Sequence, residues 1–463
     1  MKKLLIFGGI GVVLIILVVV LVSTISKRNS APKNLTLTVW SPFNEAGVFK
    51  SIGDSYTKLH PTIKVDFKYV DAKDAKDYEA QVVNAYANGI GPDIWLMRND
   101  WLPKHAAKLT SIPSTFAWSG SEETQNEQLI TYFGKSIVEQ NSTGGKFYTV
   151  PVSVDSLVLY QNTKVIEDVK QDLANQDRDL DADSLDQFPL TWADVVKISK
   201  LITQRNGQTV TRSGLAIGTV DNTYAATDVY LSLLTQYGGS LFNNDGSKNN
   251  FSLVTRDIRN RESVPSQQAL DLYTSFSRAD NANYTWNSSL GDPVTLFAQG
   301  KVAMMVGFSS LAKEIYAENP EAQVTIGSLP QVIKDADIVN YAAYWSFGVS
   351  KKSASPNSSW GFLKYLHDEK VNEAYLTATG RPGLSKYSNN LTDSFDIGSI
   401  KEMKNEIFSD QINSALVVCK PDWQQVDVTL KDMISQVNSG NSLKTALDTA
   451  SASFDKQVTD VTN

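Results

Sequence analysis

The most constraining feature of the sequence is a repeated change of hydrophobic period between residues 35 and 97. Apolar side chains alternate along short segments and then recur every three or four residues along longer ones. These are the periods of a β-strand and of an amphipathic helix. The predicted order is strand 35–39, helix 49–59, strand 63–69, a helix ending near Asn88 and strand 94–97. Strands that alternate with helices in this way predict a doubly wound α/β lobe.

Two loops of this predicted lobe are candidates for a binding site. In open α/β sheets, ligands bind beyond the carboxyl ends of the strands, which here selects the loops after Trp40 and Met97. Both loops combine polar groups suited to hydrogen bonding, and the second adds an aromatic ring. Helix capping is the alternative role for Asn44 and Glu45, which follow the first strand. The site residues predicted from these loops are Asn44, Glu45, Asn99, Asp100 and Trp101.

The N-terminus contains a segment long enough to cross a membrane. The stretch from Leu4 to Val22 is apolar and uncharged and lies between basic residues. Its 19 residues approach the roughly 20 that span a bilayer and exceed the apolar region of a signal peptide. We therefore predict a single-pass anchor at 4–25 and a linker at 26–34, with the following domain extracytoplasmic. A cleaved signal peptide is the alternative.

Charge and composition exclude several classes of function. The formal net charge is −7, and residues 1–28 carry basic residues but no acid. The remaining chain is therefore more acidic still and is not expected to bind nucleic acid. A single cysteine, Cys419, permits no intrachain disulfide, and the three histidines are far apart and lie in no metal motif. We expect no metal site and no cofactor.

An acidic segment at 167–186 weakly resembles the start of a calcium loop. Its aspartates alternate from Asp177 to Asp183. The calcium-loop pattern needs a glycine and a later bidentate glutamate, where this chain has Ala182 and Phe188. A solvated surface insertion is the favoured interpretation, and a calcium site is the alternative.

Short motifs further along the chain occur in the order found in the family 1 extracellular solute-binding proteins, whose best-known members bind maltose and related sugars. The resemblance extends over most of the chain from Leu35 onward. The chain departs from the family pattern by the missing lipid-accepting cysteine and by the acidic insertion. The motifs that carry the resemblance are Gly91-Pro92-Asp93-Ile94, Tyr148 to Asp155, Leu159 to Asn162, Pro189 to Trp192, Phe297 to Met305, Trp345 to Ser350, Trp360 to Leu366, Thr379 to Pro382 and Trp423 to Phe454.

The resemblance implies a two-lobe, periplasmic-binding-protein-like α/β fold of type II, with hinge strands between the lobes. It places the first lobe at 35–151 plus 328–382 and the second at 152–327 plus 383–463. It also implies a non-catalytic role as the solute-binding subunit of an ABC importer. The expected partners are a mono- or oligosaccharide and the transmembrane subunits of a permease.

Further site residues are predicted from the later motifs. Asp155 lies in an apolar stretch, where a carboxylate needs a partner, and Trp286 lies in a polar loop, where it would be exposed unless it covers a ligand. In the family, an aromatic platform often occupies the position of Phe308. One of Tyr344 and Trp345 is expected to face the cleft. Arg381 could donate two hydrogen bonds to a ligand or to the hinge. The added site residues are Asp155, Trp286, Phe308, Tyr344, Trp345 and Arg381.

Rings, carboxylates and amides together suit a sugar. A sugar presents hydroxyls that donate and accept hydrogen bonds, and C–H faces that pack on aromatic rings. Alternative hypotheses are a binder of the same fold for a peptide, polyamine or glycerol phosphate, a carbohydrate-active enzyme, and an adhesin or sensor without a transporter. No pair of catalytic carboxylates can be assigned from the sequence, and it contains no G-x-S-x-G elbow.

Overall fold

The computed structural model describes residues 34–462 with gaps at 121, 244–245, 257–259, 335–336, 380, 385–406, 408–410, 412–413 and 417. The predicted anchor at 4–25 and nearly all of the predicted linker at 26–34 lie outside the described residues. Within the described part of the chain, no helix combines the length and the apolar character needed to cross a membrane.

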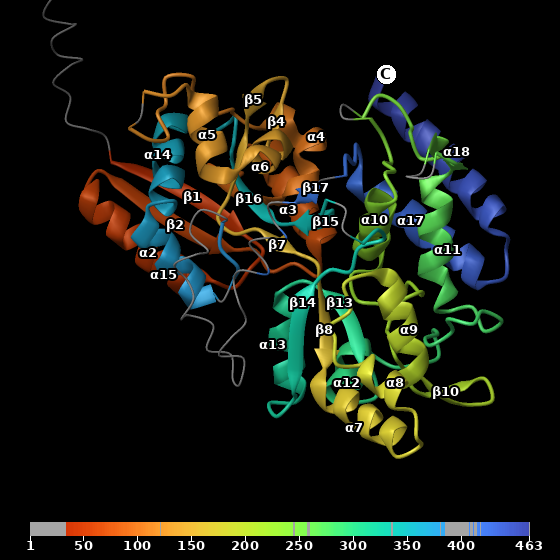
Figure 1. Cartoon of the computed structure of the whole chain (residues 1–463). Coiled ribbons are helices and arrows are strands. Elements are labelled where there is room, and N and C mark those ends of the chain that lie inside the picture. Colours follow the sequence, from red (N-terminus) through yellow and green to blue (C-terminus); the bar gives the residue numbers. More distant parts are fainter. Residues whose placement is uncertain are drawn as a thin grey trace, which may run out of the picture.

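The first lobe is built on a five-stranded mixed sheet with the order β2-β1-β3-β16-β6 (Figure 1). The first three strands are parallel, and β16 is antiparallel to both β3 and β6. The strands are β1 (Leu35–Ser41), β2 (Ile63–Tyr69), β3 (Ile94–Arg98), β6 (Thr149–Pro151) and β16 (Trp345–Val349). The three strands predicted from the sequence are confirmed, and β16 and β6 extend the sheet.

Helices cover this sheet and bury their apolar sides against it. Phe49 of α2 stacks on Phe67 of β2 with 4.5 Å between the ring centroids. Thr124 and Glu127 form a reciprocal capping box at the start of α5, which satisfies backbone N–H groups there. The helices are α2 (Ala46–Leu59), α3 (Ala75–Ala87), α4 (Leu102–His105), α5 (Gln125–Phe133), α6 (Lys135–Gln140), α14 (Pro356–Leu366) and α15 (Glu369–Thr379).

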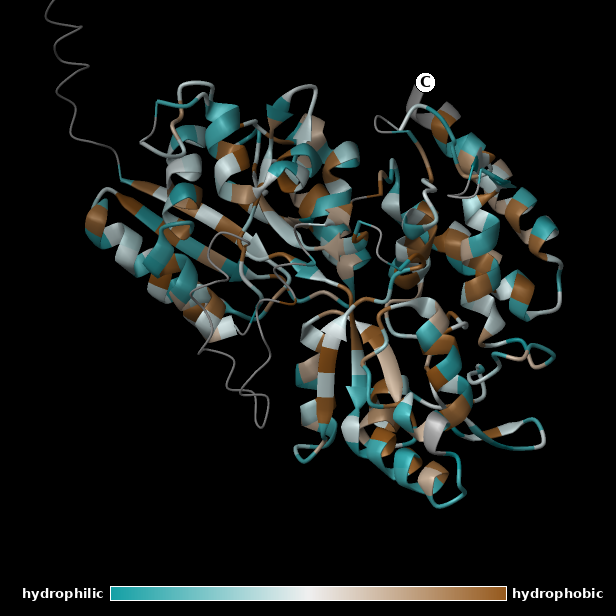
Figure 2. Cartoon of the chain, viewed as in Figure 1, coloured by the Kyte–Doolittle hydropathy of each residue, from teal (hydrophilic) through white to brown (hydrophobic). Residues whose placement is uncertain are grey.

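The second lobe has a small antiparallel sheet and a larger set of helices. Strand β8 (Val158–Asn162) lies between β13 (Met304–Gly307) and β14 (Val324–Ser328). Figure 2 shows hydrophobic residues recurring along the helices around it. These helices are α7 (Thr163–Ala174), α8 (Asp179–Asp183), α9 (Trp192–Ile202), α10 (Ala226–Gln236), α11 (Pro265–Ser275), α12 (Pro293–Ala298), α13 (Ser310–Glu318), α17 (Trp423–Asn438) and α18 (Leu443–Thr462).

A third small sheet joins the two lobes. Its strands β7 (Asp155–Ser156), β15 (Asn340–Ala343) and β17 (Ala415–Leu416) come from distant parts of the chain. β15 is antiparallel to β7 and parallel to β17. At each strand the chain passes from the hydrophobic core of one lobe to that of the other. This three-stranded connection is the candidate hinge.

Core membership suggests where the lobe boundaries lie. Val154 and Ala342 pack in the first-lobe core, whereas Leu157 and Tyr341 pack in the second. Beyond β17, Val418 packs in the second core. We therefore propose boundaries at these strands, further along the chain than the 151, 327 and 382 predicted from the sequence.

The acidic segment is largely helical. Three of the alternating aspartates, from Asp179 to Asp183, lie in the short helix α8, so the segment does not follow the extended course of a calcium loop. Basic neighbours neutralise part of the charge: Arg178 pairs with Asp181, and Lys170 pairs with Asp186. No group of three or more candidate metal ligands occurs among the described residues.

Candidate functional site

The carboxyl ends of β1 and β3 face the second lobe, and side chains from both lobes meet there. The region is called the junction below. It contains the loop from Ser41 to Glu45 and the 3-10 turn from Asn99 to Trp101. From the second lobe it contains the segment from Val418 to Gln424 and the start of α13. Most of the sequence-predicted site residues lie in or beside this region.

Asp100 is the centre of a buried charge cluster in the junction. Its side chain is 3% exposed and accepts two hydrogen bonds from Arg98, at 3.0 and 2.9 Å. Lys420 approaches from the other side, with Nζ 3.0 Å from Asp100 Oδ2 and 2.9 Å from the hydroxyl of Tyr341. Burial opposes ionisation, but Arg98 and Lys420 hold the pKa of Asp100 well below its ordinary value. Asp100 is therefore a carboxylate held in place from two sides.

Three tryptophans gather beside this cluster. The ring of Trp101 is fully buried, stacks on Trp423 of the second lobe at 5.7 Å and meets Trp345 edge-on at 5.3 Å. Trp345 and Trp423 are only partly buried. The Nε1 of Trp101 is buried and has no hydrogen-bond partner within the described structure. Trp101 thus supports the other two rings, and Trp345 and Trp423 are the rings with surface open to a ligand.

Tyr344 and Trp345 point to opposite sides, as neighbours at a strand end do. The Tyr344 hydroxyl lies in the first-lobe core, where it donates to Gln140 Oε1 and accepts from Asn141 Nδ2 at 2.8 Å. Asn99 also faces inward, since its Oδ1 accepts from the backbone N–H of Tyr344. Trp345 instead meets Phe43 edge-on at 5.2 Å. Of the predicted pair, Trp345 is the residue in the junction.

Glu45 and Arg381 form a second polar group on the first-lobe side. Arg381 donates to Glu45 Oε1 at 2.9 Å, and its guanidinium lies 4.3 Å from the centroid of the Phe43 ring. The other oxygen of Glu45 accepts from the Tyr375 hydroxyl at 3.1 Å. Asn44 is exposed beside this group. Arg381 thus holds the side chains of Glu45 and Phe43 in place. This is a structural role, and not that of a donor left free for a ligand.

Asp155 links the candidate hinge to the start of α13. Its carboxylate accepts from the backbone N–H of Ser309 at 3.0 Å and from the Ser309 hydroxyl at 2.6 Å. The adjacent Phe308 is partly buried, and its carbonyl accepts from Tyr160. The predicted partner for a carboxylate in this apolar stretch is therefore Ser309. Burial raises the pKa of Asp155 to about 6, although the Ser309 donors act in the opposite direction.

This raised pKa predicts a pH-dependent stability. Asp155 ionises near 6 in the folded chain and near 3.8 when unfolded, so the folded state binds more protons between these values. Its contribution is fully present below the unfolded pKa and is lost as pH rises through the folded pKa. Between about pH 4.5 and about pH 7.5, the wild type should lose about 2 kcal/mol of unfolding free energy relative to Asp155→Ala. Urea titrations at the two pH values measure this, and a difference independent of pH would contradict it.

The prediction that Trp286 would be exposed unless it covers a ligand is wrong. Its ring is fully buried in a second-lobe cluster with Phe297 and Leu311. The indole N–H donates to the backbone carbonyl of Asn222 at 3.0 Å. Trp286 is therefore a core residue although the residues next to it in the sequence are polar, and it is removed from the candidate site.

The junction also contains residues that sequence reasoning missed. Lys420 and Tyr341 complete the cluster around Asp100, and Glu79 of α3 binds Trp423 and Gln424. Their partners lie far away in the sequence, so no local motif marks them. In the sequence, the position of Lys420 directly after the apolar run from Ala415 to Cys419 is the signal that could have drawn attention to it.

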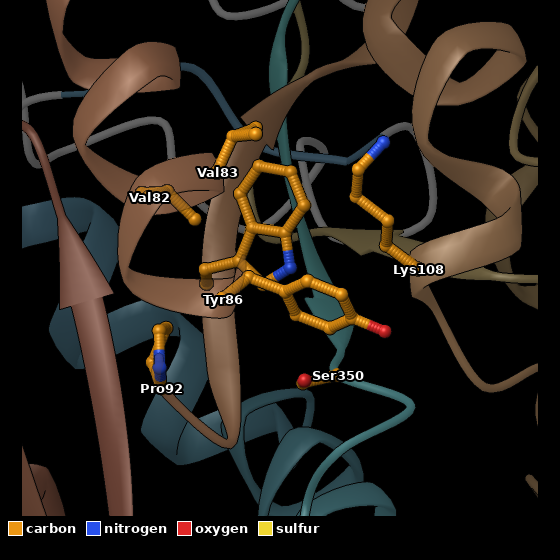
Figure 3. A pocket seen from close by; sticks show the side chains of 7 residues that line it. Val82, Val83, Tyr86, Pro92, Lys108 and Ser350 are labelled. Atoms are coloured by element: carbon orange, nitrogen blue, oxygen red, sulfur yellow. The ribbon is translucent and has the colours of Figure 1, made fainter. Parts of the chain in front are cut away.

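Two hollows of the first lobe lie outside the junction. A small apolar pocket between α3 and the end of β16 is lined by residues that include Val82, Tyr86 and Lys108 (Figure 3). An open surface groove is lined by residues that include Tyr56 and Trp118. Neither contains a predicted site residue.

Comparison with known proteins agrees with this architecture. The family model for bacterial extracellular solute-binding proteins matches residues 37–373. The maltotriose-binding protein of Pyrococcus abyssi is 23% identical over 125 residues, which are 27% of this chain and 25% of that protein. The match thus spans a quarter of the length of that curated relative.

Solved structures show the same two-lobe fold. The sugar-binding protein MalE of Xanthomonas citri has a TM-score of 0.71 at 18% identity, covering 92% of this chain and 98% of that one. A cyclo/maltodextrin-binding protein complexed with maltotetraose has a TM-score of 0.70 at 16% identity, covering 93% and 98%. Because the family model spans the greater part of the sequence, this chain belongs to the family of bacterial extracellular solute-binding proteins.

Proposed function

We propose that this chain is the solute-binding component of an ABC importer and captures a carbohydrate in the junction between its lobes. The observation that carries the proposal is the pairing of partly exposed tryptophans from both lobes, Trp345 and Trp423, beside the fixed carboxylate of Asp100. Rings suit the C–H faces of a sugar, and a fixed carboxylate suits its hydroxyls. The sugars named for its relatives support the same class of ligand.

The proposed mechanism is closure around the ligand. A saccharide that touches both lobes stabilises the closed arrangement by contacts that the open one lacks. The strands β7, β15 and β17 would bend to allow this motion. The closed form would then dock on permease subunits outside the cytoplasm, with residues 4–25 as the membrane tether. No chemical change to the solute is part of the proposal.

A thermal-shift screen of the full-length protein tests the ligand class. Glucose and mannose oligosaccharides, a polyamine, a peptide and glycerol phosphate would be added at equal concentration. A ligand at 100 times its Kd stabilises the folded state by about 2.7 kcal/mol, which raises the melting temperature by a few degrees. We expect at least one saccharide to produce this shift. A shift with the polyamine, peptide or phosphate alone would overturn the carbohydrate assignment, and product formation from an oligosaccharide would indicate an enzyme.

A further inference from the structure

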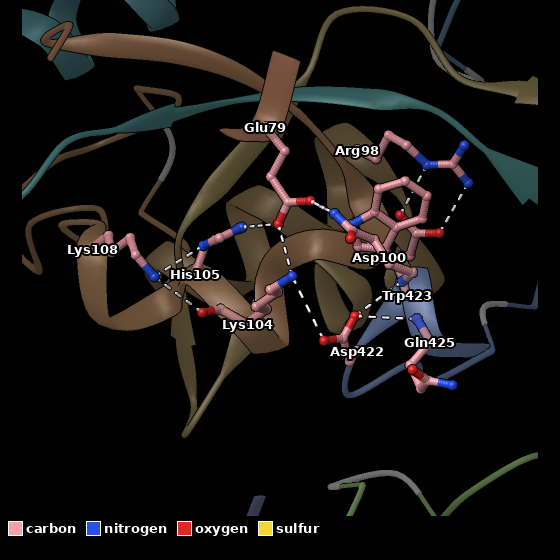
Figure 4. Close-up of polar contacts among 10 residues, drawn as sticks. Glu79, Arg98, Asp100, Lys104, His105, Lys108, Asp422, Trp423 and Gln425 are labelled. Atoms are coloured by element: carbon pink, nitrogen blue, oxygen red, sulfur yellow. Dashed lines mark hydrogen bonds and ion pairs between the residues drawn. The ribbon is translucent and has the colours of Figure 1, made fainter. Parts of the chain in front are cut away.

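The side chain of Glu79 of α3 has hydrogen-bond partners in both lobes. Its side chain is 3% exposed. Within its own lobe, Oε1 lies 2.6 Å from His105 Nε2 and 3.2 Å from Lys104 Nζ (Figure 4). These two contacts already occupy one carboxylate oxygen.

The other oxygen of Glu79 binds the second lobe. Its Oε2 accepts from Trp423 Nε1 at 2.9 Å and from Gln424 Nε2 at 2.7 Å. Both donors are on the first turn of α17. Figure 4 shows Trp423 of that helix and Glu79 of α3 among these polar contacts.

A weaker ion pair runs parallel to these bonds. Lys104 Nζ lies 3.7 Å from Asp422 Oδ2. The other oxygen of Asp422 caps α17 by accepting from the backbone N–H groups of Gln424 and Gln425. Asp422 thus caps α17 with one oxygen and pairs with the first lobe through the other. The residues Glu79, Lys104, Asp422, Trp423 and Gln424 are called the latch below.

Breaking the latch would leave the carboxylate of Glu79 with fewer hydrogen-bond partners in the protein. Burial disfavours the ionised form of Glu79, but the donors around it, His105 and Trp423 foremost, lower its pKa to about 2. When α17 moves away, one carboxylate oxygen loses both of its protein donors. Hydrogen bonds to a charged group are stronger than neutral ones, so their loss opposes opening.

We propose that the latch holds the two lobes together when no solute is bound. Each of its contacts between the lobes joins two side chains of the protein, so it acts without a ligand. The ligand-free protein is then mostly closed, and a solute enters through a minor open state. The proposal concerns the ligand-free state and does not depend on which solute binds.

Neighbouring residues on α17 provide a matched test. Gln424 is partly exposed and bonds to Glu79. Gln425 is exposed, and within the described structure only its backbone N–H is hydrogen-bonded to the latch, at Asp422. Gln424→Glu places a second carboxylate against Glu79. Gln425→Glu makes the same change of charge at the next position of α17. Gln424→Ala removes the bond without adding charge and is the milder variant.

The measurement is the distance between spin labels on the two lobes of the full-length, ligand-free protein. Lys146→Cys and Lys301→Cys supply exposed attachment sites, in a Cys419→Ser background. We expect one dominant short distance for the wild type and for Gln425→Glu. For Gln424→Glu the ratio of open to closed molecules should rise at least tenfold, and for Gln424→Ala it should rise by less.

Three outcomes would overturn the proposal. These are a wild type that is already mostly open, a Gln424→Glu variant with unchanged distances, and equal opening in Gln424→Glu and Gln425→Glu. Urea unfolding of each variant checks that the lobes remain folded. Since no solute is present, these results are independent of the carbohydrate assignment.

Discussion

Replacing Asp100 by alanine is expected to lower the free energy of unfolding by about 3–5 kcal/mol. The substitution removes the carboxylate that compensates Arg98 and Lys420, whose side chains are 23% and 7% exposed. A buried charge that loses its partner is costly, because water no longer solvates it and no counter-charge remains. Urea unfolding of the wild type and of Asp100→Ala, at neutral pH, measures the difference.

A double variant separates the charge effect from lost packing. The double variant carries Asp100→Ala and Lys420→Met. In it, the ammonium group that has lost its partner is replaced by an apolar side chain of similar length. This variant should recover at least about 1 kcal/mol relative to Asp100→Ala, because removing both partners is less costly than removing one. If the double variant lost as much unfolding free energy as the two single variants lose together, Asp100 and Lys420 would not be coupled.

The second large effect is on ligand affinity. Trp345→Ala should weaken binding of the saccharide found in the thermal-shift screen by about 30-fold, which corresponds to about 2 kcal/mol. The ring lies between Phe43 and Trp101, so it is held rigidly while part of its surface stays open. A rigid, partly exposed ring can pack on a sugar face at little cost in conformational entropy. Isothermal titration calorimetry gives the affinity of each variant.

The adjacent residue provides the control. Tyr344→Phe removes a hydroxyl that bonds Gln140 and Asn141 inside the first lobe. It should lower stability by about 1 kcal/mol or more and change affinity less than twofold. If Tyr344→Phe weakened binding as strongly as Trp345→Ala, the proposed orientation of the two side chains relative to the ligand would be incorrect.

The sequence predicts the local elements of the first lobe well. Alternating apolar residues identify β1 and β2, and β3 is the continuous apolar run that follows Gly91-Pro92-Asp93. The residues that end each helix, such as Pro61 and Gly89, are visible as turn signals. Short connecting strands are harder to predict. β7 and β17 have two residues each, and such lengths are too short for any periodic pattern. Their pairing depends on how the lobes fold.

The site is predictable only in part, for a physical reason. Asp100 and Trp345 follow or begin strands of the first sheet, and topology places strand ends together. Lys420 is 320 positions from Asp100, and Trp423 is 344 positions from Glu79. Nothing local in either partner specifies the other, since contacts at this separation arise only when the second lobe packs against the first. Trp286 shows the opposite error, where a polar loop sequence surrounds a buried ring.

A crystal structure with the strongest-binding saccharide tests the central claim most directly. We predict electron density for the sugar between the lobes, with Trp345 and at least one second-lobe side chain in contact with it. Density in the open groove beside Tyr56 and Trp118, with the junction empty, would contradict the proposal that the two lobes bind the solute between them.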